Sequence, residues 1–414
     1  MRATRLGHIR LLCRGTLPFD LLPLHQKYGP VVRIGPNELA FSNPQAWKDI
    51  MGHRTDKSEE FEKYLGFYRP VDDLPVDIVN AKREEHGLLR RTMAHGFSDR
   101  SMREQQPLIK QYVDLLMRKL RAAGGKKVDL AAWYNYTTFD VIGDLAFGES
   151  FGCLEGGEYH PWVKAIFELA RVGVVFQSLV HYPWVFKALM AVVPKSLMEE
   201  RERQLQKLQA NSAILIIGGS ETTATLLSGV TFLLMTNLDA LEKLTAEVRG
   251  AFKSEDEIDF MSVSNLPYLL ACLDEALRMY PPVPTGLPRV VPPAGASIAE
   301  HYVPGGTVVA VHQWAMYHNE EHFKKPFEFH PERWLGDPEF ASDHKEAFQP
   351  FHLGPRNCLG RNLAYIEMRL ILARVLWNFD LKMDEDSADW MSKQRIFNLW
   401  EKGALNAYLT PVQR

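Results

Sequence analysis

The segments with the clearest β-strand pattern lie at opposite ends of this chain, and this constrains the fold more than any other feature. Val31–Ile34 and Glu38–Phe41 are short β-rich runs on either side of a Gly-Pro-Asn turn, which predicts a hairpin. The tail from Gln394 to Val412 also has the pattern of strands, and helical periodicity fills most of what lies between. A minor β part drawn from both ends of a helical chain predicts one large, mainly α domain (α+β) over residues 1–414.

The composition is that of a globular protein and excludes several functional classes. The chain has 414 residues, of which 46% are hydrophobic and 24% charged, as in ordinary soluble domains. Its 48 Lys and Arg against 51 Asp and Glu give a net charge of −3, which excludes a chain-wide basic footprint for nucleic acid. The four cysteines share no short spacing, so they indicate a reducing compartment rather than a disulfide framework or a Cys-x-x-Cys zinc site. They are Cys13, Cys153, Cys272 and Cys358.

The sequence shows weak targeting and membrane signals. The first fourteen residues contain four arginines but only Leu11-Leu12 as an apolar pair, which predicts neither a signal peptide nor an anchor. The apolar stretch from Val172 to Val193 is interrupted by polar residues and by Pro183. We favour two buried helices around Pro183, and a segment lying on a membrane surface is the alternative.

Cys358 lies in the stretch Phe351–Arg361, immediately before a predicted long helix from about Leu359 to Phe379. Most free cysteines are small core residues, but this one has an unusual setting. A helix N-terminus presents free N–H groups and a positive dipole end, which favour the thiolate. Gly354 and Gly360 allow the backbone to approach closely, and Arg356 adds a fixed positive charge for an anionic ligand.

This motif resembles the haem-binding loop of the cytochrome P-450 superfamily, the haem-thiolate monooxygenases. The match includes Phe351, Gly354, Arg356, Cys358 and Gly360 and continues through Glu367, while His352 stands where the family often has serine. The resemblance implies the cytochrome P-450 fold, a single helical domain with small peripheral sheets. It also implies haem b as cofactor, with Cys358 as the axial ligand of the iron.

A second motif lies in an apolar helix at Gly218–Thr223, with the sequence Gly-Gly-Ser-Glu-Thr-Thr. Two glycines inside a helix are costly, on the order of 1 kcal/mol each against alanine. Close helix packing would explain them, and so would a local opening of the helix beside a bound group. The stretch resembles the family's oxygen-activating motif, which implies that Glu221 and Thr222 deliver protons to the reaction, with Thr223 as a weaker candidate.

Three further residues are predicted to be structural. Glu275 and Arg278 are three apart on a mostly apolar helix, so they share a face and are expected to be partly buried. Arg333, in Pro-Glu-Arg-Trp, is the expected third member. The set resembles the family's Glu-x-x-Arg plus Arg triad, and we assign it to folding and support of the haem loop rather than to catalysis.

Other basic residues match family positions that bind the haem propionates. His86 and Arg90 resemble the family's Trp-x-x-x-Arg helix, with His86 in place of tryptophan. Arg289, in Gly-Leu-Pro-Arg, matches another propionate ligand. Each residue alone has the pattern of a surface charge, and the set together with Arg356 favours the haem interpretation.

His318–His322 matches the inverted zinc-peptidase pattern His-x-x-Glu-His. Such a site needs a helix with both histidines on one face, but Pro326 follows closely and a strand-like run precedes the motif. We therefore keep a zinc peptidase only as a remote alternative.

The resemblance implies an enzyme that inserts one atom of dioxygen into a lipophilic small molecule and looks closest to fungal members acting on trichothecene-like secondary metabolites. Electrons would come from NADPH through the FMN domain of NADPH–cytochrome reductase, with cytochrome b5 as a second donor. Residues 82–121 hold ten basic and five acidic residues, and a basic patch there would attract an acidic donor. We expect a monomer on the cytoplasmic side of the endoplasmic reticulum, soluble or peripheral because no anchor is seen.

One junction departs from the family pattern. A charged helix starting at Pro194 runs directly into the apolar Ala213–Ile217, with neither Gly nor Pro between Pro194 and Gly218. Family members normally have several dozen more residues here, which predicts an internal deletion near 207–212 in addition to the missing N-terminal anchor. A haem-binding but catalytically impaired homologue is therefore the second hypothesis.

Overall fold

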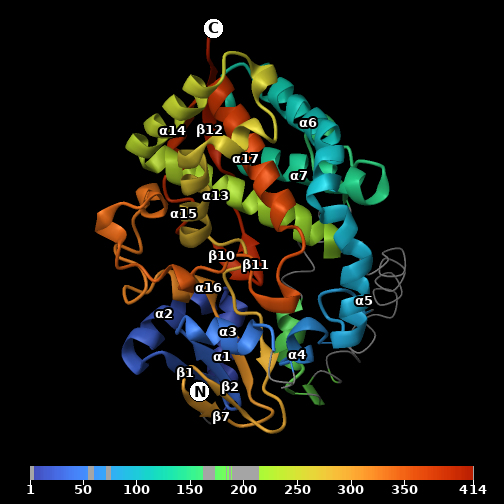
Figure 1. The fold of residues 1–414 in the computed structure, drawn as a ribbon, viewed down its shortest axis with the longest axis vertical. Helices are drawn as coiled ribbons and strands as arrows, with labels where there is room; N and C mark the ends of the chain where they lie inside the picture. The colour runs from blue at the N-terminus through green and yellow to red at the C-terminus, as the bar shows by residue number, and fades with distance from the viewer. Residues whose placement is uncertain are drawn as a thin grey trace.

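The computed structural model describes residues 4–54, 60–70, 76–161, 173–182, 184–185, 188 and 214–413. Helices dominate it, as the sequence predicts. In Figure 1 the helices α6, α7, α13, α14, α15 and α17 are packed together in the upper part of the view, and the sheet with β1 and β2 lies below them beside α1, α2 and α3. The N-terminus lies near the bottom of this view and the C-terminus at its top.

The predicted long helix from about Leu359 to Phe379 is observed as α17 with small shifts at its ends, and the structure shows further helices that the sequence did not mark, such as α1 and α2. The helices before residue 160 are α1 (Leu6–Arg14), α2 (Leu17–Tyr28), α3 (Gln45–Met51), α4 (Leu65–Tyr68), α5 (Arg83–Ala94), α6 (Asp99–Ala122), α7 (Leu130–Phe147) and α8 (Cys153–Gly156). Those after residue 213 are α13 (Thr222–Thr236), α14 (Leu238–Ala251), α15 (Pro267–Met279), α16 (Gln313–Tyr317) and α17 (Arg361–Asn378).

Local chemistry explains several of these helix boundaries. The hydroxyl of Ser98 accepts a hydrogen bond from the N–H of Ser101 (3.2 Å) and caps α6. The carboxylate of Asp129 accepts from the N–H of Ala132 (3.2 Å) and caps α7. Residues 173–179 are helical, but Pro183 and the predicted junction near 207–212 lie outside the described residues.

The β part joins segments that are far apart in sequence. The largest sheet has the order β1-β2-β8-β5-β3, in which the predicted hairpin β1–β2 is antiparallel and β2 runs parallel to β8. A second sheet has the order β4-β12-β9, so the tail strand β12 pairs with segments near residues 128 and 381. The two ends of the chain therefore contribute to different sheets, each by long-range pairing.

The strand boundaries follow. In the two larger sheets they are β1 (Val31–Gly35), β2 (Glu38–Phe41), β3 (Glu62–Lys63), β5 (Arg289–Val290), β8 (Val308–Val311), β4 (Lys127–Asp129), β9 (Phe379–Met383) and β12 (Asn406–Pro411). The two hairpins are β6 (Ala296–Ile298) with β7 (His301–Val303), and β10 (Arg395–Phe397) with β11 (Leu399–Glu401).

α13 forms the centre of the helical core. Every residue from Thr223 to Met235 is buried, and the helix packs against α7, α15 and α17. Among the described helices, one continuous span, Ile214–Thr236, is long and apolar enough to cross a membrane by length and composition. Because 67% of its most apolar window is buried inside the protein, this span has the character of a core helix.

Candidate active site

The loop that carries Cys358 is tightly packed against α3. Its backbone closes on itself, because the N–H of Cys358 donates to the carbonyl of Phe351 (2.9 Å). Gly354 adopts a φ of +72°, and a Cβ on this residue would lie 1.9 Å from the carbonyl oxygen of Met51. Glycine is therefore required here for two independent reasons, the left-handed backbone and the contact with α3.

Replacing Gly354 with alanine is expected to destabilise the protein by about 1–3 kcal/mol, because the new methyl group overlaps main-chain atoms that cannot rotate away. Urea unfolding measures the loss. Gly250→Ala is the matched control, since a Cβ at this helical position meets no atom within 4 Å. Equal stabilities of the two variants would contradict this account of the loop.

Cys358 is exposed to the cavity that it lines, while protein atoms pack densely around that part of the loop. Burial raises the pKa of Cys358 above the usual value, and this effect outweighs the lowering by the Gly360 N–H and by the charges of Arg90 and Arg361. The N–H at the helix N-terminus thus acts in the expected direction, towards the thiolate, but burial outweighs it in the absence of a bound group. A metal ion bound at the sulfur would supply the missing stabilisation of the thiolate, because metal binding displaces the thiol proton.

The cavity lies between the Cys358 loop, α5 and the start of the helix that contains α13, and encloses about 950 Å³ of empty space. It brings together most of the sequence-predicted residues, although they come from three separate parts of the chain. Those that line it are His86, Arg90, Thr222, Phe351, Arg356, Cys358 and Gly360. Apolar side chains complete the wall, namely Ile78, Val79, Phe97, Ile142, Ile214, Leu215, Leu359 and Leu363.

The predicted opening of the apolar helix is confirmed, since residues Ile217–Glu221 form a π-helical turn immediately before α13. The two glycines of this turn have different roles. A Cβ on Gly219 would lie 2.8 Å from Cδ1 of Ile142, so Gly219 permits close packing against α7. A Cβ on Gly218 would meet no atom within 4 Å, and Gly218 lines the cavity. Both glycines line the cavity, so the opened turn involves the pair, and close packing against α7 is an additional reason for glycine at position 219.

Glu221 and Thr222 are adjacent in sequence but have different surroundings. Thr222 lines the cavity, and its hydroxyl donates to the carbonyl of Gly218 (2.7 Å). Glu221 is not among the lining residues, because its buried carboxylate forms an ion pair with Lys402 and accepts from the hydroxyl of Thr225 (3.2 Å). Lys402 also donates to Thr225 (2.7 Å). In this structure Glu221 is thus directed towards the C-terminal segment rather than towards the cavity.

Basic side chains gather at one end of the cavity. Arg90 donates to the carbonyl and side-chain oxygens of Asn357 (2.7 and 2.5 Å), which ties α5 to the Cys358 loop. Arg356 bonds to Glu60 (2.5 Å) and to the carbonyl of Ala81 (2.8 Å). Lys63, which the sequence analysis missed, also lines the cavity. Burial lowers the pKa of Lys63 well below its usual value, and the neighbouring positive charges of Arg289 and Arg356 lower it further.

Two predicted propionate ligands differ from expectation in detail. Arg289 is not among the lining residues; it lies behind Arg356, 3.8 Å from the same Glu60 carboxylate. Its Nε is buried and has no hydrogen-bond partner among the described residues. His86 lines the cavity, but burial and the charges of Arg356, Lys63 and Arg90 lower its pKa to about 4. In this surrounding His86 is a neutral N–H donor and not the cation that the motif suggested.

The predicted triad is observed as a fully buried ion cluster. Arg278 binds both carboxylate oxygens of Glu275 (2.8 and 3.0 Å), and Nε of Arg333 lies 3.2 Å from Oε2. All three side chains have no exposed surface. The Trp334 indole also donates to Oε2 (3.0 Å), and Arg278 further donates to the carbonyl of Pro326 (2.7 Å). The cluster thus fastens α15 to the irregular segment that leads to the Cys358 loop.

The zinc-peptidase pattern is not supported by the geometry. Nδ1 of His318 pairs with the carbonyl of Trp314 (2.8 Å), and its ring stacks on that indole. Nε2 of His322 pairs with the carbonyl of Ser42 (2.8 Å). The two imidazoles therefore face different partners, and within the described ranges no group of three or more His, Cys, Asp or Glu side chains converges as a metal site.

The cavity fits haem b on three observations. A single thiol faces it from a loop whose glycine permits close approach, the opposite wall is a locally opened helix, and one end carries an excess of basic groups with an unpartnered guanidinium nitrogen. Haem b needs an axial sulfur ligand, space on the opposite face, and cations for its two propionates. Cys358 would hold the iron, and Arg90, Arg356 and Lys63, with Arg289 behind them, would face the propionates.

The chain matches a known family over nearly its whole length. The family model described as Cytochrome P-450 matches it in two segments, residues 2–210 and 197–405. The cytochrome P-450 monooxygenase prhB of Penicillium brasilianum is 44% identical, with 99% of this chain and 91% of the relative covered. Averantin hydroxylase of Dothistroma septosporum is 42% identical (99% and 84% covered), and trichothecene C-15 hydroxylase of Fusarium sporotrichioides is 41% identical (99% and 91% covered).

The fold, the thiol-lined cavity and these matches define a haem-thiolate oxidoreductase. The chain belongs to the cytochrome P-450 family, and it is a monooxygenase of the type found in fungal secondary metabolism. The predictions of fold class and enzyme class are thereby confirmed.

Proposed function

We propose that this protein hydroxylates a lipophilic secondary metabolite at a C–H bond, using electrons from NADPH that a reductase delivers. The observation that carries the proposal is the single thiol of Cys358 facing a largely apolar cavity with a basic end. The named relatives that hydroxylate a trichothecene and averantin support this substrate class. We also propose that residues 1–414 act as one domain and as a monomer, on the cytoplasmic side of the endoplasmic reticulum.

In this proposal the bound haem supplies activation of dioxygen, with the Cys358 sulfur donating electron density to the iron. The chain supplies everything around it. The apolar wall, including Ile142, Ile214 and Leu215, excludes water and orients the substrate. The hydroxyl of Thr222 stands at the opened turn, where it can release its bond to the Gly218 carbonyl and pass a proton into the cavity. Glu221 is a positioning residue, held by Lys402 behind this turn.

The reduced protein bound to carbon monoxide tests the proposal directly. A thiolate-type absorption band supports axial ligation by a cysteine, and its absence refutes the haem-thiolate assignment. NADPH-dependent oxygenation of a trichothecene-like terpenoid in the presence of reductase then tests the reaction. A protein with the band but no oxygenated product from any of a panel of such substrates contradicts the proposed activity.

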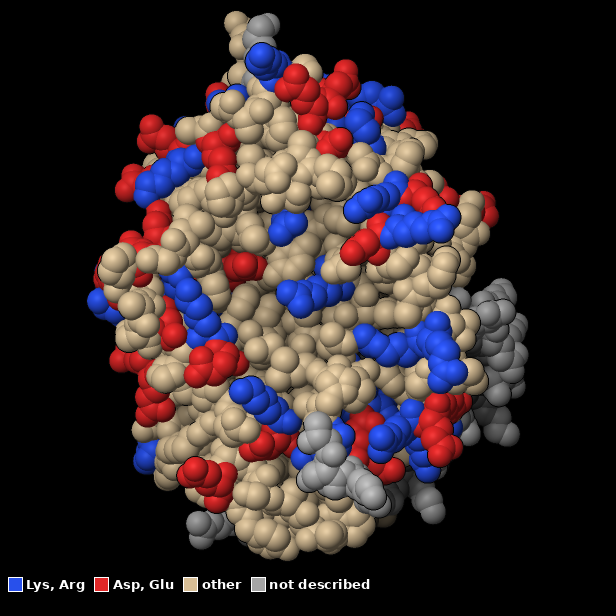
Figure 2. All heavy atoms as spheres, viewed as in Figure 1, with Lys and Arg blue, Asp and Glu red and all other residues tan. Residues whose placement is uncertain are grey.

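The electron donor is proposed to dock over α5, α6 and α17. Figure 2 shows exposed Lys and Arg side chains in the middle and on the right of this face, while many acidic side chains lie towards its left edge. The exposed basic residues of these helices include Arg83, Arg91, Arg103, Arg118 and Arg361. Such a surface is complementary to an acidic donor, either the FMN domain of the reductase or cytochrome b5.

A second candidate function is a haem-binding homologue with impaired catalysis. The family model matches in two pieces that meet at residues 197–210. The alignment with the prhB relative spans 447 positions, more than the 414 residues of this chain, so the relative carries residues inside the alignment that this chain lacks. A thiolate-type band without turnover would select this candidate over the active enzyme.

Replacing Thr222 with valine is expected to lower product formation on the order of 10²-fold, because the hydroxyl is lost while the shape is kept. The measurement is product formed per NADPH consumed. The control is Thr236→Val at the other end of the same helix, where the hydroxyl likewise donates to the carbonyl four residues earlier (3.0 Å). Product yields that are equal in the two variants would remove Thr222 from the proposed proton path.

A further inference from the structure

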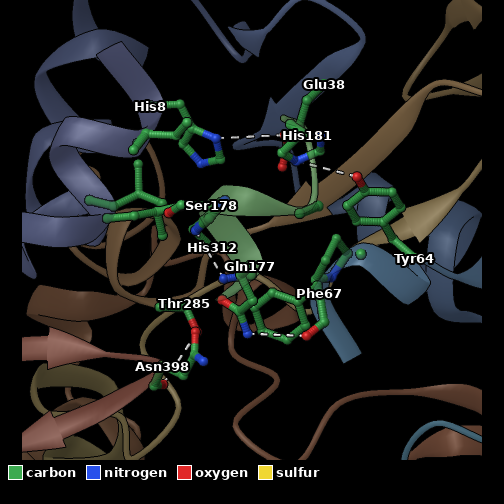
Figure 3. A pocket seen from close by; sticks show the side chains of 17 residues that line it. His8, Glu38, Tyr64, Phe67, Gln177, Ser178, His181, Thr285, His312 and Asn398 are labelled. Atoms are coloured by element: carbon green, nitrogen blue, oxygen red, sulfur yellow. Dashed lines mark hydrogen bonds and ion pairs between the residues drawn. The ribbon is translucent and has the colours of Figure 1, made fainter. Parts of the chain in front are cut away.

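A second pocket lies beside the cavity at Cys358 and is formed by seven segments that are separate in sequence (Figure 3). The empty space in and in front of this open pocket is about 590 Å³, and its apolar wall includes Leu12, Leu17 and Phe67. In the described parts of the chain it shares no lining residue with the first cavity. The two are nevertheless neighbours, because Lys63 lines the first cavity and the next residue, Tyr64, lines the second.

The charged groups of this pocket are paired with one another. The carboxylate of Glu38 binds Arg5 (2.6 Å) and lies 3.7 Å from Nδ1 of His8. The hydroxyl of Tyr64 pairs with Nε2 of His181 (3.4 Å). In Figure 3 the side chains of Glu38, His8, His181 and Tyr64 occupy the upper part of the view. Because the basic side chains of Arg5 and His8 already face the carboxylate of Glu38, the pocket is poorly suited to binding an ionised acid.

The remaining polar groups have unused hydrogen-bonding atoms. Nε2 of His312, Oε1 of Gln177 and Oδ1 of Asn398 are buried and have no partner among the described residues. The other polar atoms of two of them are engaged: Nδ1 of His312 accepts from the N–H of Gly286 (2.9 Å), and Nε2 of Gln177 donates to the carbonyl of Phe67 (3.1 Å). A native protein rarely leaves three such atoms unpaired in one pocket.

The tautomer of His312 follows from its contacts. Burial, together with the charges of His25 and His8, lowers its pKa to about 3, so the ring is neutral at physiological pH. Since Nδ1 accepts a hydrogen bond, the single ring proton is on Nε2. The pocket therefore offers one donor, His312 Nε2–H, and two acceptors, the side-chain oxygens of Gln177 and Asn398.

We propose that this pocket binds a hydroxyl group on a neutral lipophilic molecule, with His312 donating to the hydroxyl oxygen and Gln177 or Asn398 accepting its proton. A hydroxyl is the simplest group that both donates and accepts, so it matches this set, whereas a hydrocarbon leaves all three atoms unpaired. This inference rests on the proposed function and extends it. The substrate is an uncharged molecule that already carries a hydroxyl group. Its polar end lies in this pocket while its reacting carbon faces the first cavity.

Calorimetric titration of the haem-loaded protein with borneol and with bornane, its parent hydrocarbon, tests the proposal. Borneol is expected to bind about tenfold more tightly than bornane, the effect of one well-formed buried hydrogen bond. His312→Phe keeps an aromatic ring but removes the donor, and it should abolish the preference for borneol. His301→Phe, at an exposed position in β7, is the matched control and should retain it.

Equal affinities for the two probes in the unchanged protein would overturn the proposal, as would a His312→Phe variant that keeps the preference for borneol. If His312→Phe fails to fold, a double variant with Gln177→Met and Asn398→Gly removes both acceptors, and glycine keeps the positive φ of position 398; this variant must also reduce the preference. Failure of the hydroxyl pocket can be distinguished from failure of the proposed function, because none of the substituted residues lines the Cys358 cavity. A missing thiolate band refutes the haem assignment and leaves selective borneol binding intact. A thiolate band together with equal affinities for borneol and bornane refutes only the hydroxyl pocket.

Discussion

The Cys358→Ser protein is expected to show no thiolate-type band in the reduced, carbon-monoxide difference spectrum, and to lose monooxygenase activity completely. Serine is nearly the same size as cysteine, so the packed loop between Phe351 and Gly360 should survive the change. A serine hydroxyl does not ionise at neutral pH, and its oxygen is a poor ligand compared with a thiolate. The effect should therefore be spectroscopic and catalytic rather than a loss of fold.

The matched control is Cys13→Ser in α1, since Cys13 is also free and exposed but is not among the residues that line the Cys358 cavity. This variant should give the band and the activity of the unchanged protein. Urea unfolding of both variants separates a lost ligand from a lost fold. A thiolate-type band that persists in Cys358→Ser would show that another cysteine holds the iron, and it would end the present assignment of the cavity.

Glu275→Ala is expected to unfold readily and to bind no haem. The change leaves the guanidinium groups of Arg278 and Arg333 buried without their shared carboxylate, which costs about 3–5 kcal/mol. Burial alone would raise the pKa of Glu275, but the charges of Arg278 and Arg333 and their hydrogen bonds outweigh it and keep the pKa below the usual value. The carboxylate is therefore ionised at neutral pH and fully engaged in the cluster.

The measurements are urea unfolding and the ratio of bound haem to polypeptide. Glu104→Ala is the control, because Glu104 forms an exposed pair with Arg100 whose loss should cost less than about 1 kcal/mol. The contrast separates the buried cluster from an ordinary surface ion pair. Full haem content in purified Glu275→Ala protein would show that the cluster does not support the Cys358 loop.

Much of the candidate site could be predicted because its chemistry lies in short motifs. The Cys358 loop places its glycines, arginine and cysteine within ten residues, and the Gly-Gly-Ser-Glu-Thr-Thr motif likewise marks the opened turn at Gly218. The Glu275–Arg278 spacing determines a shared helix face, and an apolar face predicts burial. In each case the signal is local, so one turn of helix or one loop is enough to reveal it.

The residues that sequence reasoning missed are those placed by long-range contacts. Lys63 reaches the cavity because the short strand β3 pairs with β5, more than 200 residues later, and no local pattern marks it. Lys402 meets Glu221 across a separation of 181 residues. Asn357 could have been found, since it lies inside the cysteine motif, but its contact with Arg90 depends on how α5 docks.

By itself, the sequence determined the helical class, the positions of most long helices, the family, the cysteine that is proposed to hold the iron, and the residues of the buried ion cluster. These depend on periodicity and on spacings of a few residues, which local backbone geometry translates directly into faces and loops. Only the tertiary structure decided the direction of the pKa shifts of Cys358 and His86, the direction in which Glu221 points, and the existence of a second pocket with unpaired polar atoms. Burial and charge at those sites are sums over neighbours from distant segments, and no short stretch of sequence contains them.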